Sequence, residues 1–431
     1  MIRVIALAAL ALVACGGSSP STPDAGPTPP TRDDHRDVLS TDLAIDLATQ
    51  HGTATITLAP ATTAGASFEI GDLDIDTVTS GGQPIPFATD GARIDLGVAP
   101  DAAPLTLEIA YRWHFHEAFD GISAGGFTFL WPYYCGNAFP CRSEPADGER
   151  FTLALTGVPT DAVAVYPHAI ATDAPPYQVA WATGAYTRLD LGATTAGTTV
   201  GVWHLPGQDA KAAQGGAHLR DAFDWYERTL GPYRCGADVA GVAVPWGPGA
   251  FGGMEHHPYW HVGAGSLGDE VTEVHEAAHG WFGDGIRIAC WEDFVLSEGT
   301  VTYLAARSLT EVAGATVGNA VWQSYATDLG SIAGTDPVWP DSCGAVDVLK
   351  DHLFSDAPYK RGAFFYKAVA DRVGVDALDQ ALAAFYQAHA GGTARMQDML
   401  DQIKTSTGFD PTACAAMWLR STAIPTPGPC P

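Results

Sequence analysis

Residues 274–303 read VHEAAHGWFGDGIRIACWEDFVLSEGTVTY, and this stretch spaces polar side chains as one face of a helix would. His275 and His279 are four residues apart, so on a helix their side chains lie one turn apart on the same face. Asp269 can cap the start of this helix, and Gly283 can end it. Both imidazoles can therefore reach one metal ion.

Glu298 follows His279 after eighteen intervening residues, on what we expect to be the next helix. A chance HExxH in such a chain has a probability of about 1%, and the added glutamate lowers it to roughly a few in ten thousand. Two imidazoles and one carboxylate leave the fourth position of a zinc site open for water. The sequence therefore predicts one Zn²⁺ per chain on His275, His279 and Glu298, with Glu276 beside it as general base. The alternative is a solvated polar helix face.

The whole chain has 431 residues and a formal net charge of −27, with 22 Lys and Arg against 49 Asp and Glu. This charge repels polyanions, so we expect no nucleic-acid partner. At this length and with 46% hydrophobic residues, two domains are the natural expectation. Short alternating segments broken by Gly, Pro and Asp predict a β-rich domain over residues 37–205.

From residue 206 the spacing of apolar residues becomes helical, which predicts a second, α/β domain over residues 206–431. The segment GVAVPWG at 241–247 is typical of a buried strand that runs into a glycine-rich loop. We expect helices at about 269–282, 298–312, 361–373, 376–389 and 395–405.

The amino terminus has the pattern of a bacterial lipoprotein signal peptide over residues 1–15. Leu-Val-Ala-Cys at 12–15 resembles a lipobox, which implies that Cys15 is lipidated and anchors an exported protein to the membrane. Because Gly16 is not the aspartate that retains lipoproteins in the inner membrane, the outer membrane is favoured. Residues 16–36 are rich in Gly, Ser, Pro and Thr and are expected to form a flexible tether. The alternative is an ordinary secretory signal with a chance cysteine.

Seven further cysteines lie at 135, 141, 235, 290, 343, 414 and 430, and an exported protein would keep disulfides. Connectivity is open, although Cys135 with Cys141 and Cys414 with Cys430 are the pairs closest in sequence. At least one cysteine must stay unpaired within the chain.

The opening stretch resembles the aminopeptidase N family of gluzincin peptidases, in which HExxH is followed by x-W-F-G and later by W-x-D-x-W-L-N-E-G. Residues 275–283, HEAAHGWFG, and 291–299, WEDFVLSEG, carry this pattern, with Gly280 for a frequent Gln and Ser297 for a frequent Asn. Residues 252–256, 357–362 and 139–145 resemble the family's G-x-M-E-N, Y-x-K-G and F-P-C-x-D-E-P segments. The resemblance covers roughly residues 37–390 and implies a thermolysin-like catalytic domain, in a short form without the helical carboxy-terminal domain.

The resemblance also implies roles for further residues. Tyr359 would donate a hydrogen bond to the reaction's oxyanion, since its pKa near 10 keeps it protonated. Glu255, in the segment Gly252, Gly253, Met254 and Glu255, would pair with the substrate's α-ammonium. His256 departs from the family's Asn, and whether the β domain contributes to the amine pocket stays open.

Three other side chains near these motifs have less defined expectations. Asp293 is a candidate hydrogen-bond partner for a zinc-ligating histidine. His257 and His261 are expected to be surface or loop residues rather than a second metal site.

Together these features predict an exported zinc-dependent aminopeptidase acting on extracytoplasmic peptides. One alternative is an endopeptidase or broad peptidase with an open cleft. The other is a non-catalytic surface-binding lipoprotein on the same scaffold, although all three ligands and the base are present.

Overall fold

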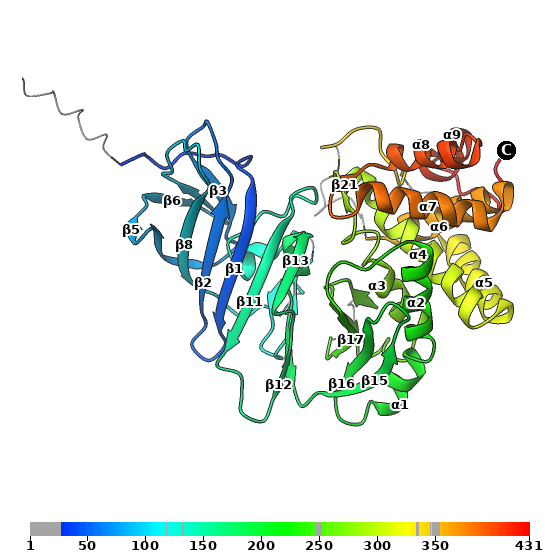
Figure 1. Ribbon diagram of the computed structural model, residues 1–431, viewed down its shortest axis with the longest axis horizontal. Coiled ribbons are helices and arrows are strands. Elements are labelled where there is room, and N and C mark those ends of the chain that lie inside the picture. The colour runs from blue at the N-terminus through cyan, green and yellow to red at the C-terminus, as the bar shows by residue number, and fades with distance from the viewer. Residues whose placement is uncertain are drawn as a thin grey trace, which may run out of the picture.

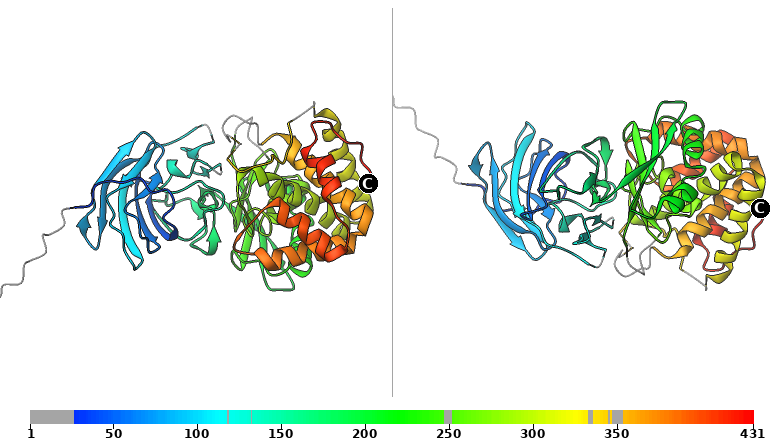
Figure 2. Two further views of the ribbon diagram at one scale, coloured as in Figure 1. Left: turned by 90° about the horizontal axis from the view of Figure 1, so that it is seen from above. Right: turned by 90° about the horizontal axis from the view of Figure 1, so that it is seen from below.

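The computed structural model describes residues 27–117, 119–131, 133–246, 252–332, 336–344, 346 and 354–431. A β-rich part from the first half of the chain lies beside a largely helical part along the long axis (Figures 1 and 2). This arrangement confirms the predicted α+β fold class. The predicted signal peptide and Cys15 lie outside the described residues. Among the residues that are described, no helix is long and apolar enough to cross a membrane.

The β-rich part is built on a seven-stranded sheet in which only β1 and β11 pair in parallel. Side chains alternate along its strands, so that Ile56 and the opposing Leu107 are both fully buried. The strand order is β13 (Ala169–Ala174), β11 (Glu149–Thr156), β1 (Val38–Asp46), β2 (His51–Leu58), β8 (Leu105–Arg112), β4 (Asp74–Ser80) and β5 (Gln83–Pro84).

Smaller sheets complete this part of the chain. A three-stranded sheet has the order β3 (Ala66–Glu69), β7 (Arg93–Leu96) and β6 (Phe87–Asp90). Two-stranded pairs are β9 (Gly121–Ile122) with β10 (Thr128–Phe129) and β12 (Val163–Val165) with β14 (Ala182–Gly184).

The end of the predicted tether packs against this part of the fold. Thr31 forms a β-bridge with Leu96. Arg36 is buried, and its guanidinium donates to the carbonyls of Ala59 and Ala99. The expectation of a flexible tether is therefore wrong for residues 31–36, because a cation within the segment finds buried carbonyl partners.

A five-stranded sheet supports the second half of the chain. Its order is β15 (Thr187–Ala193), β16 (Thr199–His204), β17 (Asp238–Val244), β19 (Tyr259–Gly263) and β18 (Gly253–Met254). β15 and β16 lie within the predicted β-rich domain, yet they hydrogen-bond into this sheet through the parallel pairing of β16 with β17. Alternating side chains identify a strand but not its neighbours, so the sequence pattern placed these strands with the wrong sheet.

The helices surround one side of this sheet and form the right-hand part of Figure 1. They are α1 (Asp209–Gly215), α2 (Leu219–Thr229), α3 (Glu270–Ala278), α4 (Phe294–Val312), α5 (Ala315–Ser331), α6 (Asp356–Val373), α7 (Val375–His389), α8 (Met396–Thr407) and α9 (Thr412–Ala415). The sequence analysis missed α5. Its buried Val321, Tyr325 and Leu329 do recur every four residues, but Gly318 and Gly330 weaken the helical signal.

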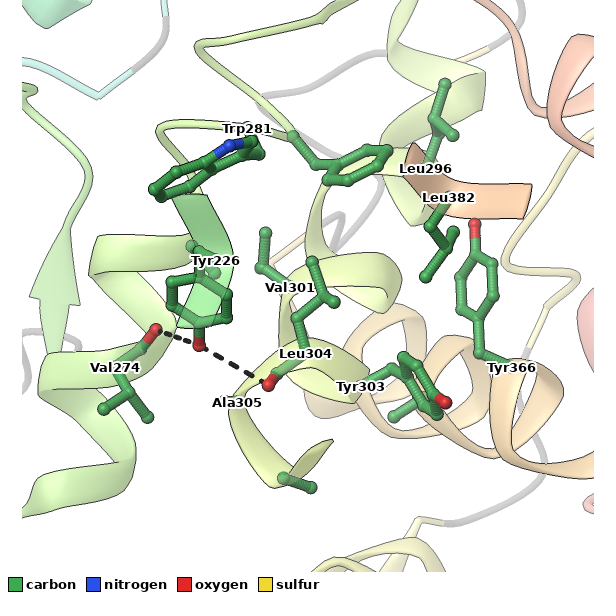
Figure 3. Close-up of a cluster of buried hydrophobic side chains, with 14 of the residues drawn as sticks. Tyr226, Val274, Trp281, Leu296, Val301, Tyr303, Leu304, Ala305, Tyr366 and Leu382 are labelled. Atoms are coloured by element: carbon green, nitrogen blue, oxygen red, sulfur yellow. Dashed lines mark hydrogen bonds between the residues drawn. The ribbon is translucent and has the colours of Figure 1, made fainter. Parts of the chain in front are cut away.

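A buried aromatic cluster locks α3 and α4 together behind the site. Figure 3 shows the hydroxyl of Tyr226, on α2, between α3 and α4. This hydroxyl donates to the carbonyl of Val274 at 3.0 Å, and Leu304 O lies 3.4 Å away. Trp281 packs against the Tyr226 ring and is fully buried. The backbone next to His275 is thereby fixed relative to α4.

Helices α4 and α6 cross at a pair of glycines. A Cβ on Gly299 would lie 2.8 Å from the Cα of Gly362, so neither position has room for a side chain. This close approach brings Glu298, next to Gly299, toward Tyr359, one turn before Gly362. A short β-pair, β20 (Arg287–Ile288) with β21 (Thr393–Ala394), ties the loop after α3 to the segment before α8.

Six cysteines form disulfides, and one cysteine in the described chain is free. The bonds join Cys135 to Cys141, Cys414 to Cys430, and Cys290 to Cys343, while Cys235 is buried and unpaired. Both pairs singled out by their sequence proximity are therefore bonded.

Candidate metal and substrate site

A cavity of about 250 Å³ lies between the edge strand β18 and helices α3, α4, α5 and α6. Every candidate catalytic, substrate-binding and metal residue in the described chain lines it. These are Gly252, Gly253, Met254, Glu255, His275, Glu276, His279, Glu298 and Tyr359. Segments separated by more than a hundred residues thus meet at one place.

Three donor atoms converge at the centre of this cavity. His275 Nε2 lies 3.1 Å from Glu298 Oε2 and 3.3 Å from His279 Nε2. His279 Nε2 lies 3.5 Å from the same carboxylate oxygen. A tetrahedral zinc with ligand bonds of about 2.0–2.2 Å requires ligand atoms roughly 3.2–3.6 Å apart, so the donor set fits this ion.

The second nitrogen of His279 is also positioned. Nδ1 lies 3.0 Å from the carbonyl oxygen of Phe282, an acceptor, so the proton sits on Nδ1 and Nε2 offers its lone pair to the cavity. Ser297 Oγ lies 3.4 Å from the same Nδ1. The tight turn after α3 makes this contact possible, and it ends the helix at Ala278 rather than at the expected Gly283.

Asp293 does not bond a histidine, so that expectation is wrong. Its Oδ1 accepts from Trp339 Nε1 at 3.1 Å and from the backbone N–H of Met396 at 3.0 Å. These bonds hold the start of α4 to the segment before α8. The carboxylate therefore stabilises the scaffold.

The Glu276 side chain is 6% exposed and lies beside the converging ligands. A Cβ on Gly253 would be 2.4 Å from Glu276 Oε1, so only glycine allows β18 to approach this carboxylate. Burial raises the pKa of Glu276 well above its ordinary value, with nearby Glu255 and Glu298 acting in the same direction. By contrast, His279 and the bonds from both imidazoles overcome burial and hold the pKa of Glu298 at about 2.

Glu255 closes one end of the cavity through a contact with the β-rich part. Tyr177, in the short 3₁₀ helix Pro176–Gln178, donates a hydrogen bond from its hydroxyl to Glu255 Oε1, at 2.9 Å. The same hydroxyl lies 3.0 Å from Asp284 Oδ1. All three side chains are buried. Burial raises the pKa of Glu255, so an arriving cation would favour its charged form.

Tyr359 occupies the opposite side of the ligand group. Its ring stacks on that of His275, with ring centres 6.0 Å apart. Burial and the nearby Glu298, Glu255 and Glu276 raise the pKa of Tyr359 well above 10, so the hydroxyl keeps its proton. The side chain is therefore available as a hydrogen-bond donor.

The histidines after Glu255 are buried. His257 lies in the turn between β18 and β19, which agrees with the expected loop position, whereas His261 lies within β19, so the expected surface or loop position is wrong for it. His257 bridges Tyr233 OH and the carbonyl of Glu276, both at 2.8 Å. His261 Nδ1 lies 3.1 Å from Thr128 O, and the ring of His256 packs against His261. They are buried because this segment runs from β18 into β19, inside the sheet. None of the three belongs to a described group with the spacing of metal ligands.

Sequence reasoning missed Tyr177 and Asp284. Asp284 directly follows the W-F-G segment, so its position next to a recognised motif was a usable signal. Tyr177 lies 78 residues before Glu255 in a proline-flanked turn, and no spacing rule connects the two. The sequence left open whether the β-rich part contributes to this end of the cavity. The structure shows that it contributes the hydroxyl of Tyr177.

Comparisons with known proteins agree with this geometry. Residues 269–418 match the model of the peptidase family M1 domain. Aminopeptidase N of Streptomyces lividans is 29% identical over 161 residues, covering 36% of this chain and 18% of that protein. Aminopeptidase M1-C of Oryza sativa subsp. japonica is 25% identical over 331 residues, covering 67% and 36%. The chain thus spans only a minor part of these curated relatives.

Solved structures share the fold over nearly the whole chain. The M1 zinc metallopeptidase from Deinococcus radiodurans superimposes with a TM-score of 0.78 and 19% identity, covering 91% of this chain and 96% of that one. A mutant of that enzyme bound to a Tyr-Ser-Ala substrate gives a TM-score of 0.77. Residues 269–418 are thus similar to the peptidase family M1 domain, and the chain shares the two-part fold of the M1 zinc metallopeptidase from Deinococcus radiodurans.

Proposed function

We propose that this protein is a zinc-dependent aminopeptidase that removes residues from the free amino terminus of peptides. The observation that carries the proposal is the convergence of three zinc-type ligands in a cavity that also holds Glu276, Glu255 and Tyr359. One ion per chain fits this donor set. The likeness to M1 peptidases supports the reaction class.

The side chains divide the chemistry among them. Zinc, when bound, supplies Lewis-acid activation of water and of the scissile carbonyl. Glu276 accepts the proton of the attacking water and delivers it to the leaving amine, a task suited to a carboxylate with a raised pKa. Tyr359 donates its hydroxyl hydrogen to the developing oxyanion.

Backbone and side chain together would orient the peptide. β18 is the last strand of its sheet, and its residues line the cavity, so its outer backbone groups can pair with an extended substrate. The Glu255 carboxylate would then bind the α-ammonium, and Tyr177 holds that carboxylate in place.

The space beyond Glu255 favours an aminopeptidase over an endopeptidase. On that side lies a pocket of about 20 Å³, lined by Pro145, Pro175 and Tyr177 among others. Such a volume holds about one water molecule, and a peptide chain cannot continue through it. When the first residue of a substrate lies over the zinc ligands, there is therefore no room for a further residue before it.

The test is metal analysis of the purified protein combined with hydrolysis of matched peptides. We expect about one zinc per chain and rapid cleavage of peptides with a free amino terminus. The same peptides with an acetylated amino terminus should be poor substrates. Equal rates on both would establish a broad peptidase, and bound zinc without turnover on any peptide would leave a binding protein on this scaffold.

We further propose that the substrates are extracytoplasmic and that the protein is tethered to the outer membrane through a lipid on Cys15. The lipobox-like segment and the three disulfides support this, since disulfides persist outside the cytoplasm. Cys15→Ser should leave export intact and move the protein from the detergent phase to the aqueous phase on partitioning. A variant that stays with the detergent would contradict lipidation at this cysteine.

A further inference from the structure

The cavity has two chemically different ends. Glu255 lies at the His279 end, where carboxylate oxygens of Glu255 and Glu276 and a ring nitrogen of His279 are all within 4.8 Å of one another. Tyr359 lies at the other end, stacked on His275. If Glu255 holds the amino terminus, the residues that follow the scissile bond point toward the His275 end.

The cavity continues at that end along the first turns of α3. Val271 and Thr272 line it, and they precede His275 on the helix by four and three residues, respectively. A helix rises about 1.5 Å per residue, so these positions extend the cavity by roughly 6 Å beyond the ligand. Tyr325 on α5 and Lys360 on α6 line the same region.

Lys360 places a positive charge in this leaving-group end. Its side chain is 16% exposed, its Nζ lies 4.3 Å above the centre of the Tyr325 ring, and Asp328 Oδ2 is 3.3 Å away. Among the described lining residues it is the one lysine or arginine. The aromatic face holds the ammonium in position without using its hydrogen-bond donors.

The partners of Lys360 leave it able to bind an anion. Asp328 is 41% exposed, and such ion pairs are weak, while an ammonium has three donors. Asp269, the nearest lining carboxylate on α3, already caps its helix by accepting from the Val271 N–H and the Thr272 hydroxyl. A ligand carboxylate therefore has a donor at Lys360 that Asp269 does not occupy.

We propose that Lys360 binds the C-terminal carboxylate of short peptides, so that the protein acts preferentially on di- and tripeptides. This inference rests on the proposed aminopeptidase function and specifies its substrate class. The cavity of about 250 Å³ is small beside the ~300–1,000 Å³ of most ligand pockets. An extended chain advances about 3.3–3.6 Å per residue, so one or two residues after the scissile bond bring a carboxylate to this end.

The first arm of the test compares a tripeptide with its C-terminal amide, both with a free amino terminus. We expect the parent to favour the free acid by about tenfold in kcat/KM, and Lys360→Met to abolish that preference by lowering kcat/KM mainly on the free acid. Lys367→Met is the matched control, because Lys367 lies two turns further along α6, outside the cavity, paired with Asp371. It should retain the parent's preference.

Two outcomes would overturn this inference without touching the proposed aminopeptidase function. One is a parent that cleaves the free acid and the amide equally well. The other is a Lys360→Met protein whose kcat/KM falls equally on both peptides. Failure of the parent to cleave either peptide would instead refute the proposed function.

The second arm measures binding without turnover, on zinc-loaded Glu276→Gln protein by calorimetry. The free-acid tripeptide should bind about tenfold more tightly than its amide, and adding Lys360→Met should make the two affinities equal. Equal affinities before that substitution would contradict a carboxylate site.

Discussion

The metal centre and the amine end of the cavity, where Glu255 lies, were assembled in different ways. The candidate metal ligands come from 24 consecutive residues, residues 275–298, on α3, at its C-terminal cap and on the helix that follows it. At the amine end, Tyr177 bonds Glu255 across 78 residues and contacts Asp284 across 107. A metal site of this kind is specified by helix periodicity, whereas the amine end depends on how the β-rich part packs against the catalytic part.

The metal centre and the amine end also differ in the groups that surround their carboxylates. Glu298 is surrounded by imidazoles, which hold its pKa low. Glu255 is buried beside Asp284 and a neutral hydroxyl, and burial raises its pKa. The metal centre is therefore preorganised for a cation by its own ligands. At the amine end, the charged form of Glu255 is favoured only when an ammonium arrives.

The largest effect on turnover should come from a change at the metal centre, Glu276→Gln. The substitution preserves shape and leaves all three ligands, so zinc content should equal the parent's. Loss of the general base should reduce kcat by about a hundredfold or more.

His279→Ala provides the contrast, since it should lose both zinc and turnover. A Glu276→Gln protein that holds zinc and works at the parent's rate would refute the assigned role of Glu276.

A smaller effect is expected at the amine end, with Glu255→Ala. Loss of one charge-assisted hydrogen bond of about 1.5–3 kcal/mol corresponds to roughly ten- to hundredfold in kcat/KM. The loss should appear on free-amine peptides and not on acetylated peptides of the same sequence, while zinc content stays unchanged. A Glu255→Ala protein whose kcat/KM falls equally on both kinds of peptide would contradict a separate role for the amine end.

The smallest effect should follow Tyr177→Phe, which removes only the hydroxyl that orients Glu255. We expect a rise in KM of about three- to tenfold for free-amine peptides, with little change in kcat, because one neutral hydrogen bond contributes about 0.5–1.5 kcal/mol.

Tyr259→Phe is the matched control, since Tyr259 also donates to a carboxylate, Asp238, but outside the cavity. If both variants behave alike, Tyr177 has no particular role in amine recognition.

Elements with strong periodicity were predicted well. The helix expected at 376–389 is α7 within one residue. α5 was missed, since few of its side chains are buried and its glycines, Gly318 and Gly330, weaken the helical signal. β16 was recognised as a strand and assigned to the wrong sheet, because pairing depends on partners far along the chain.

The histidines illustrate the same limit within the site. His275 and His279 were identified because their four-residue spacing has a meaning on any helix. His257 and His261 have no such pattern, and the tertiary structure buries both: His257 bonds the backbone of Glu276 on α3, whereas His261 contacts the carbonyl of Thr128 in the β-rich part. Their burial follows from the order of the strands in the sheet, and a short segment of sequence does not contain that information.

The sequence by itself determined the candidate metal ligands, the proposed general base and the α+β class, because each depends on local spacing or on the alternation of apolar residues. Only the tertiary structure decided that Tyr177 reaches Glu255, that α4 and α6 meet at Gly299 and Gly362, and that Lys360 faces the leaving-group end. These contacts join residues distant along the chain, and their geometry is set by the packing of whole helices and sheets.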